Sequence, residues 1–126
     1  MPGPIDGAKP VAFIPVTDRE RSRLFYQGTL GLELVADEPF ALVFDLGGHE
    51  LRLTIVESLM PQSFTVFGWQ VDDIERSVRR LVASGVSFER YAPLDQDAAG
   101  TWRSPSGARI AWFKDPDGNL LSLTQV

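Results

Sequence analysis

Two similar segments decide the fold of this chain: VTDRERS at residues 16–22 and VDDIERS at residues 71–77. A second pair of segments follows later in each half, DLGGHELRLT at 45–54 and DPDGNLLSLT at 115–124. Because self-similarity within a chain indicates repeated structural units, the sequence predicts two copies of one module. The second copy is the longer of the two, since more residues separate its two matching segments.

The two copies together fill 126 residues, which is the size of one domain. We therefore expect a single domain over 1–126, with module one at about 9–57 and module two at about 64–126. Each copy reads as a strand and a helix followed by three strands. The expected later strands are 32–37, 40–46 and 49–57 in module one, and 86–91, 109–114 and 119–125 in module two. The predicted fold class is α+β, with two βαβββ modules forming a curled mixed sheet.

The helix starts and hairpin turns carry recognisable signals. Thr17 with Glu20, and Asp72 with Glu75, have the spacing of a capping box at the start of a helix. The other acidic residues of the repeats are interpreted as caps and turns rather than as acid–base groups; they are Asp18, Asp73, Asp115 and Asp117. The lone histidine, His49, is interpreted as a turn residue at a hairpin tip.

The composition limits the functions that the chain can have. The formal net charge is −5, which disfavours nucleic acid and anionic membranes as partners because both attract basic patches. The chain has no cysteine and one histidine, so disulfides, cysteine zinc sites and sites with two histidines from one chain are excluded. The N-terminal segment lacks the apolar run of a signal peptide, and no stretch is long enough for a membrane helix, so we expect a cytoplasmic protein.

Strand alternation assigns the side chains of each sheet to two faces. One face is purely apolar and should carry the helices, whereas the other mixes apolar walls with a few polar groups, as small-molecule pockets do. Pairing across the two hairpins is expected to place Leu42 opposite Arg52 and Trp112 opposite Ser122. The seven residues predicted to bind a ligand are Phe13, Leu42, Arg52, Thr54, Trp102, Trp112 and Ser122.

The repeated segments resemble the vicinal-oxygen-chelate superfamily, the group of glyoxalase I, bleomycin-resistance proteins and extradiol dioxygenases. The resemblance rests on VTDRERSRLFYQGTLGLEL at 16–34, VDDIERSVRRLVASGV at 71–86 and FKDPDGNLLSLTQ at 113–125. It implies two βαβββ modules whose sheets curl into a ligand-binding cup, often completed by a second chain. We therefore expect a homodimer whose partner is a small-molecule ligand.

Metal-using members of that superfamily hold their ion at four positions on the concave face. The corresponding positions in this chain are Val11, Arg52, Val66 and Ser122. Two hydrocarbon side chains, a cation and a hydroxyl cannot hold a divalent metal at ordinary strength, so we expect no metal and no other cofactor. A divalent metal remains an alternative if Glu50, His49 and Ser122, some of them from a second chain, form a relocated site.

Three of the predicted ligand residues have competing interpretations. Arg52 could clamp a carboxylate, phosphate or phenolate of a ligand, or it could pair with Glu50 two residues away on the same face. Trp112 could stack on a planar ligand or pack at a dimer interface or in the core. Trp102 lies in the long insert 92–107, which has the length of a lid or binding loop but could simply tuck into the domain.

Several functions are compatible with these patterns. The first is a metal-free protein that holds a small, partly aromatic ligand in the cup, as bleomycin-resistance proteins sequester a drug. The alternative is a metal-dependent lyase, isomerase or dioxygenase of the same superfamily with a relocated metal site. A third is a regulatory or structural dimer with an empty cup. The net charge favours a cationic ligand and Arg52 an anionic one, so the sequence predicts neither the ligand nor whether the protein is an enzyme.

Overall fold

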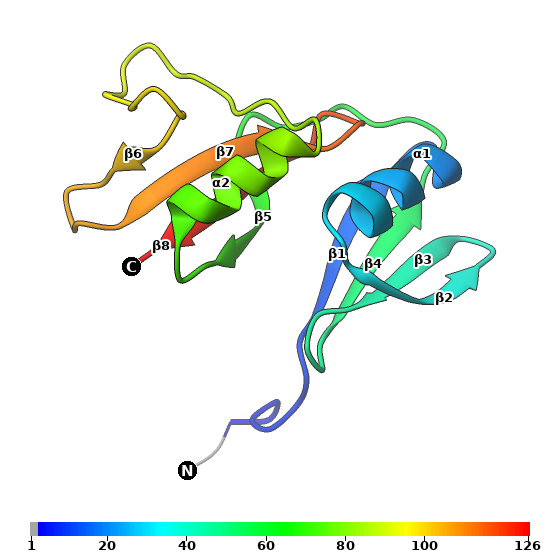
Figure 1. The fold of residues 1–126 in the computed structure, drawn as a ribbon. Helices are drawn as coiled ribbons and strands as arrows, with labels where there is room; N and C mark the ends of the chain where they lie inside the picture. The colour runs from blue at the N-terminus through cyan, green and yellow to red at the C-terminus, as the bar shows by residue number, and fades with distance from the viewer. Residues whose placement is uncertain (1–2) are drawn as a thin grey trace.

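The computed structural model describes residues 3–126, which form two four-stranded sheets with a helix on one face of each (Figure 1). The first half contains β1 (Val11–Val16), α1 (Arg19–Arg23), the π-helical segment η1 (Leu24–Thr29), β2 (Glu33–Glu38), β3 (Ala41–Asp45) and β4 (Glu50–Ile55). The second half contains β5 (Thr65–Gln70), α2 (Ile74–Ala83), β6 (Trp102–Arg103), β7 (Arg109–Lys114) and β8 (Leu120–Gln125).

Both sheets have the same topology. Their strand orders are β1-β4-β3-β2 and β5-β8-β7-β6. In each sheet the first strand pairs in parallel with the last, and the other pairs are antiparallel. The predicted fold class, α+β with two βαβββ modules and mixed sheets, is therefore confirmed. Across residues 3–126 there is no helix with the length and apolar character that a membrane crossing requires.

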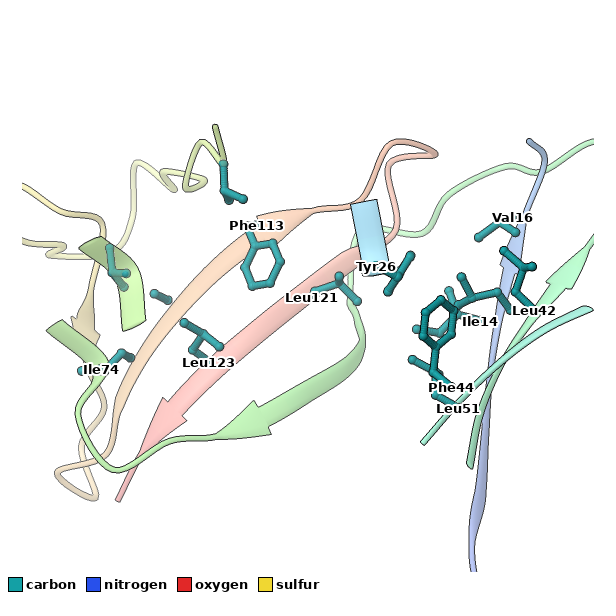
Figure 2. Close-up of a cluster of buried hydrophobic side chains, with 14 residues drawn as sticks. Ile14, Val16, Tyr26, Leu42, Phe44, Leu51, Ile74, Phe113, Leu121 and Leu123 are labelled. Atoms are coloured by element: carbon teal, nitrogen blue, oxygen red, sulfur yellow. The ribbon is translucent and has the colours of Figure 1, made fainter. Parts of the chain in front are cut away.

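The helix-covered faces of the two sheets share one hydrophobic core. Its side chains include Ile14 and Leu51 from the first sheet and Phe113 and Leu121 from the second. Figure 2 shows these side chains projecting into the space between the sheets, with Tyr26 of η1 between the two groups. Because both covered faces turn toward this core, the uncovered faces turn away from it, in different directions.

The helices begin one residue later than the predicted capping boxes. The caps are Asp18 and Asp73, whose carboxylates accept hydrogen bonds from the backbone N–H groups of Arg21 and Arg76 at 2.9 and 3.1 Å. The interpretation of Asp18 and Asp73 as caps is confirmed, whereas the predicted cap at Thr17 is wrong because that residue bonds to the other module.

The two hairpins differ in loop length, and this difference corrects the predicted position of Leu42. In module one the turn has two residues, Gly47 and Gly48, both at positive φ, so that Val43 lies opposite Arg52. In module two the turn has one residue more, so that Trp112 lies opposite Ser122 as predicted. Leu42 instead pairs with Leu53 and is fully buried on the helix-covered face.

The expected strand at 86–91 is wrong. This segment makes only an isolated bridge between Phe88 and Phe113, with a backbone hydrogen bond from Glu89 to Trp112. The chain then leaves the sheet through a turn at Tyr91 and returns as β6, which pairs with the other end of β7. The long insert therefore divides the edge strand of module two into two short pieces.

A buried carboxylate joins the two modules at the β7–β8 turn. Asp115 is 5% exposed and accepts hydrogen bonds from the backbone of Asp117 and of Asn119, each at 2.9 Å, and from the Asn119 side chain at 2.8 Å. Its fourth donor is the hydroxyl of Tyr26 in module one, at 2.7 Å. The same Asn119 amide donates to the carbonyl of Pro15 in β1 at 2.8 Å.

A second set of contacts flanks this carboxylate. The backbone N–H of Thr17 donates to Asp117 at 3.1 Å, and the Thr17 hydroxyl donates to the same carboxylate. Arg21 of α1 forms an ion pair with Asp117 at 3.2 Å. The interpretation of Asp115 and Asp117 as turn residues is confirmed, and both also bind module one.

Replacing Tyr26 by phenylalanine should destabilise the protein. The change deletes one donor to the buried Asp115 carboxylate while keeping the ring, so we expect a loss of about 1.5–3 kcal/mol in the free energy of unfolding. Urea denaturation measures this loss. Tyr91→Phe is the matched control because the Tyr91 hydroxyl donates no hydrogen bond among the described residues, and a loss as large as that of Tyr26→Phe would contradict the assignment.

Stability should also fall at alkaline pH through Tyr26. Burial, reinforced by the negative charge of Asp115, raises the pKa of the Tyr26 phenol above its usual value of 10.0. The folded protein therefore keeps a proton that the unfolded chain releases, and this contribution is complete below pH 10 and decreases as pH rises above it. The wild type should lose about 1 kcal/mol relative to Tyr26→Phe between pH 10 and 11, and the loss should approach about 1.4 kcal/mol per pH unit above pH 11. Parallel stability profiles of the two proteins would refute this.

Candidate functional site

Each sheet has one face that no helix covers, and these two faces hold the candidate site. Open face one consists of Val11, Phe13, Glu38, Val43, Glu50, Arg52 and Thr54. Open face two consists of Gly68, Trp102, Ile110, Trp112, Ser122 and Thr124, with Tyr91 against Trp112. The division between these faces follows directly from the strand registers, because residues opposite one another in a ladder share a face.

Six of the seven predicted ligand residues lie on the open faces, in two groups. Those on open face one are Phe13, Arg52 and Thr54. Those on open face two are Trp102, Trp112 and Ser122. Within residues 3–126 the two groups make no hydrogen bond, ion pair or aromatic contact with each other. The chain therefore separates these six residues into two groups, and the seventh residue, Leu42, belongs to the core.

Arg52 is surrounded by carboxylates of its own face. One of its terminal nitrogens donates to both oxygens of Glu38 at 3.0 and 3.1 Å, and the other lies 3.6 Å from Glu50. Of the two interpretations of Arg52, internal pairing is therefore observed, with Glu38 as the nearer partner. Two carboxylates around one guanidinium leave this part of open face one with a surplus of negative charge.

Glu38 was not identified from the sequence because its position depends on a bulge. The register of β2 against β3 shifts between Leu34 and Ala36, which moves the end of β2 by one residue. A bulge of this kind turns the side chains that follow it onto the other face. The simple alternation of β2 gives no local signal for the shift.

Three aromatic rings gather on open face two. The indoles of Trp102 and Trp112 lie 6.0 Å apart between ring centroids, with an interplanar angle of 31°. The ring of Tyr91 meets Trp112 edge-on at 5.5 Å, and all three side chains are half-buried. Trp102 thus tucks against the sheet, as one interpretation of the insert predicted. The half-exposed rings offer a flat apolar surface to a planar molecule.

Ser122 lies at the centre of open face two, next to a glycine. A side-chain carbon built at Gly68 would fall 2.3 Å from the Ser122 hydroxyl oxygen, so the absence of a side chain at 68 is what leaves room for this hydroxyl. The Ser122 hydroxyl makes no hydrogen bond within the described residues. It is therefore available as a donor or an acceptor beside the aromatic rings.

The positions that hold a metal in the superfamily do not fit a metal here. Val11 and Arg52 lie on β1 and β4, Val66 lies at the irregular start of β5, and Ser122 lies on β8. In the part of the chain that the structure describes, no three side chains of the histidine, cysteine, aspartate or glutamate type are grouped to hold an ion. The donor set offers no anionic ligand, and Arg52 would repel a cation.

Comparisons with known proteins agree with this architecture. The family model of the Glyoxalase/Bleomycin resistance protein/Dioxygenase superfamily matches residues 9–123. YraH of Bacillus subtilis (strain 168) is 27% identical over 126 residues, covering 88% of this chain and 92% of that protein.

Two solved structures extend the likeness to three dimensions. A member of the superfamily from Sphaerobacter thermophilus DSM 20745 is 27% identical with a TM-score of 0.73, covering 94% of this chain and 96% of that one. TnmS3 of Streptomyces sp. CB03234, described as an antibiotic binding protein, is 28% identical with a TM-score of 0.69, covering 93% of both chains. With the family model matching almost the whole sequence, the chain belongs to the Glyoxalase/Bleomycin resistance protein/Dioxygenase superfamily.

Proposed function

We propose that this protein binds a planar, partly aromatic small molecule without a metal at the superfamily's positions. The observation that carries the proposal is the aromatic surface of Tyr91, Trp102 and Trp112, which remains half-exposed beside the free hydroxyl of Ser122. An apolar surface with a few polar groups is the usual composition of a small-molecule site. The similarity to TnmS3, a protein described as binding an antibiotic, supports the same class of function.

The ligand site is completed by a second copy of the chain. Open face two of one subunit meets open face one of its partner, so that the two half-sites enclose the ligand. Phe13 supports this arrangement because it is 63% exposed in the single chain, and Val11 beside it is 43% exposed. Both residues lie on the edge strand β1, and exposed apolar side chains there are stabilised when a partner surface covers them.

The ligand is neutral or cationic rather than anionic. Glu38 and Glu50 offset the charge of Arg52, and an anion placed there would compete with two carboxylates that are already present. Aromatic rings attract cations through their negative faces, which adds to the same preference. Arg52 therefore does not act as a clamp for an anionic group of the ligand. Glu38 and Glu50 hold its guanidinium in place, and its remaining N–H groups contact the ligand.

Trp112→Ala should weaken ligand binding at least tenfold. Truncating a central aromatic anchor removes the stacking surface, whereas a peripheral residue has little effect. A thermal-shift screen of aromatic antibiotics and metabolites first finds a ligand, and isothermal titration calorimetry then measures its affinity for each variant. Phe64→Ala, which removes an exposed ring outside the aromatic surface, is the control. Equal losses in both variants would contradict the proposal.

The same screen separates the proposed function from metal-dependent catalysis. Protein purified without chelators is analysed for metals, and the screen is repeated with Mn²⁺, Fe²⁺, Ni²⁺ and Zn²⁺. We expect no stoichiometric metal and no ligand whose binding requires one. A tightly bound equivalent of metal together with turnover of a substrate would favour a lyase, isomerase or dioxygenase instead.

Subunit mixing should restore binding between two defective variants. Phe13→Ala removes a contact on open face one, and Trp112→Ala removes one on open face two. If each site takes one face from each subunit, a mixed dimer contains one doubly altered site and one intact site. After unfolding and refolding together, about a quarter of the sites should regain wild-type affinity. No recovery in confirmed mixed dimers would mean that both faces of a site come from one chain.

A further inference from the structure

A cavity of about 330 Å³ lies between the modules, on the side of the sheets that carries the helices. Its walls come from α2 and β5 of module two and from the segment after η1 in module one. Gln70, which shares a face with Thr124 by register, lines its edge, but none of the residues proposed to bind a ligand on open faces one and two lines it. The cavity is therefore separate from the proposed ligand site, and it requires both modules of the same chain.

The walls of the cavity are aromatic and aliphatic. Trp69 and Phe113 are stacked, with ring centroids 6.5 Å apart and an interplanar angle of 15°. Leu81 of α2 lines the same space, and Leu30 and Leu32 of module one line it as well. Trp69, backed by the buried ring of Phe113, and the leucines around it make an apolar wall that suits a planar hydrocarbon body.

The polar groups of the cavity favour an anion. Ser77, Arg80 and Ser84 are spaced three and four residues apart along α2 and at its C-terminal end, so they lie on one side of the helix. The lining residues include Arg80 but no aspartate or glutamate, in a chain with 17 acidic residues. Arg80 also forms no ion pair within residues 3–126.

A purely structural role for Arg80 accounts for only part of this arrangement. A cation in the last turn of a helix interacts favourably with the helix dipole, and Arg80 has that position in α2. The dipole does not account for an apolar slot beside the guanidinium, nor for the absence of carboxylates around it. Both features together describe a site for an amphipathic anion.

We propose that this cavity binds an aromatic monocarboxylate of about two fused rings. The rings lie against Trp69 and the leucines around it, and the carboxylate accepts hydrogen bonds from Arg80 and from the serine hydroxyls beside it. The size follows from the volume, because a cavity of about 150 Å³ accommodates one benzene ring and this one is roughly twice as large. The site is distinct from the proposed function and does not depend on a second chain.

Naphthalene-2-carboxylate and its uncharged analogue, naphthalene-2-carboxamide, test the proposal. In the variant Trp102→Phe/Trp112→Phe, Trp69 is the one remaining tryptophan of the three in the chain, so its fluorescence reports on this cavity. We expect a saturable fluorescence change with the carboxylate. Arg80→Gln in the same background should weaken carboxylate binding about tenfold and leave carboxamide binding unchanged, because only the charged group depends on the guanidinium.

Arg76→Gln is the matched control, since Arg76 lies on the same helix but does not line the cavity. It should change neither affinity. Three results would overturn the proposal: no saturable response to the carboxylate, equal losses in Arg80→Gln and Arg76→Gln, or equal affinities for carboxylate and carboxamide in the unaltered cavity. Amide chemical shifts should change at Leu30 and Leu81, and changes confined to the open faces would count against it as well.

Discussion

The carboxylate of Asp115 is the interaction on which the arrangement of the two modules depends. A buried charge is costly unless hydrogen bonds replace its hydration, and Asp115 accepts four of them. Three donors come from its own turn and make that turn rigid. The fourth, Tyr26, comes from the other module, so the rigid turn is also a docking point. Asn119 completes the connection by donating to the backbone of β1.

This docking explains why the faces of the sheets differ in character. Each module alone is at the lower end of the size range of folded domains, and α1 is a helix of only five residues, so a single module buries only a small core. Joining the modules at Asp115 brings the covered faces together and makes one core from two small ones. The open faces are then left without a cover in the single chain. The aromatic and charged side chains on them contact one another rather than the shared core.

The repeat predicted most of the fold, and it failed where the two copies are not equivalent. Capping residues, turns and the alternation of β4 and β8 depend on local chemistry, which the sequence displays directly. The predicted pairing of Leu42 with Arg52 fits a hairpin loop as long as that of module two, whereas the loop of module one is one residue shorter. A two-residue turn at Gly47 and Gly48 places Val43, rather than Leu42, opposite Arg52, so the correct pairing could have been predicted from the sequence.

Other parts of the candidate site depend on contacts between distant residues. Glu38 reaches Arg52 only because of the bulge in β2, and Tyr91 reaches Trp112 only because the insert leaves the edge of β7. Neither contact can be predicted from the sequence around these residues, because both depend on how the strands pair in the folded sheet. The same holds for the cavity beside Trp69, which exists only once the two modules have docked.

The two proposed sites differ in the charged side chains around them. On open face one, two carboxylates surround Arg52 at a position where relatives hold a metal ion, so a fixed cation with its own counter-charges occupies that place. The exposed Arg80 at the cavity forms no ion pair within residues 3–126. The two proposed sites therefore differ in the charges that a ligand would meet. A single chain with net charge −5 can therefore present an anion site and a cation-tolerant surface, because local surroundings rather than total charge decide the selection.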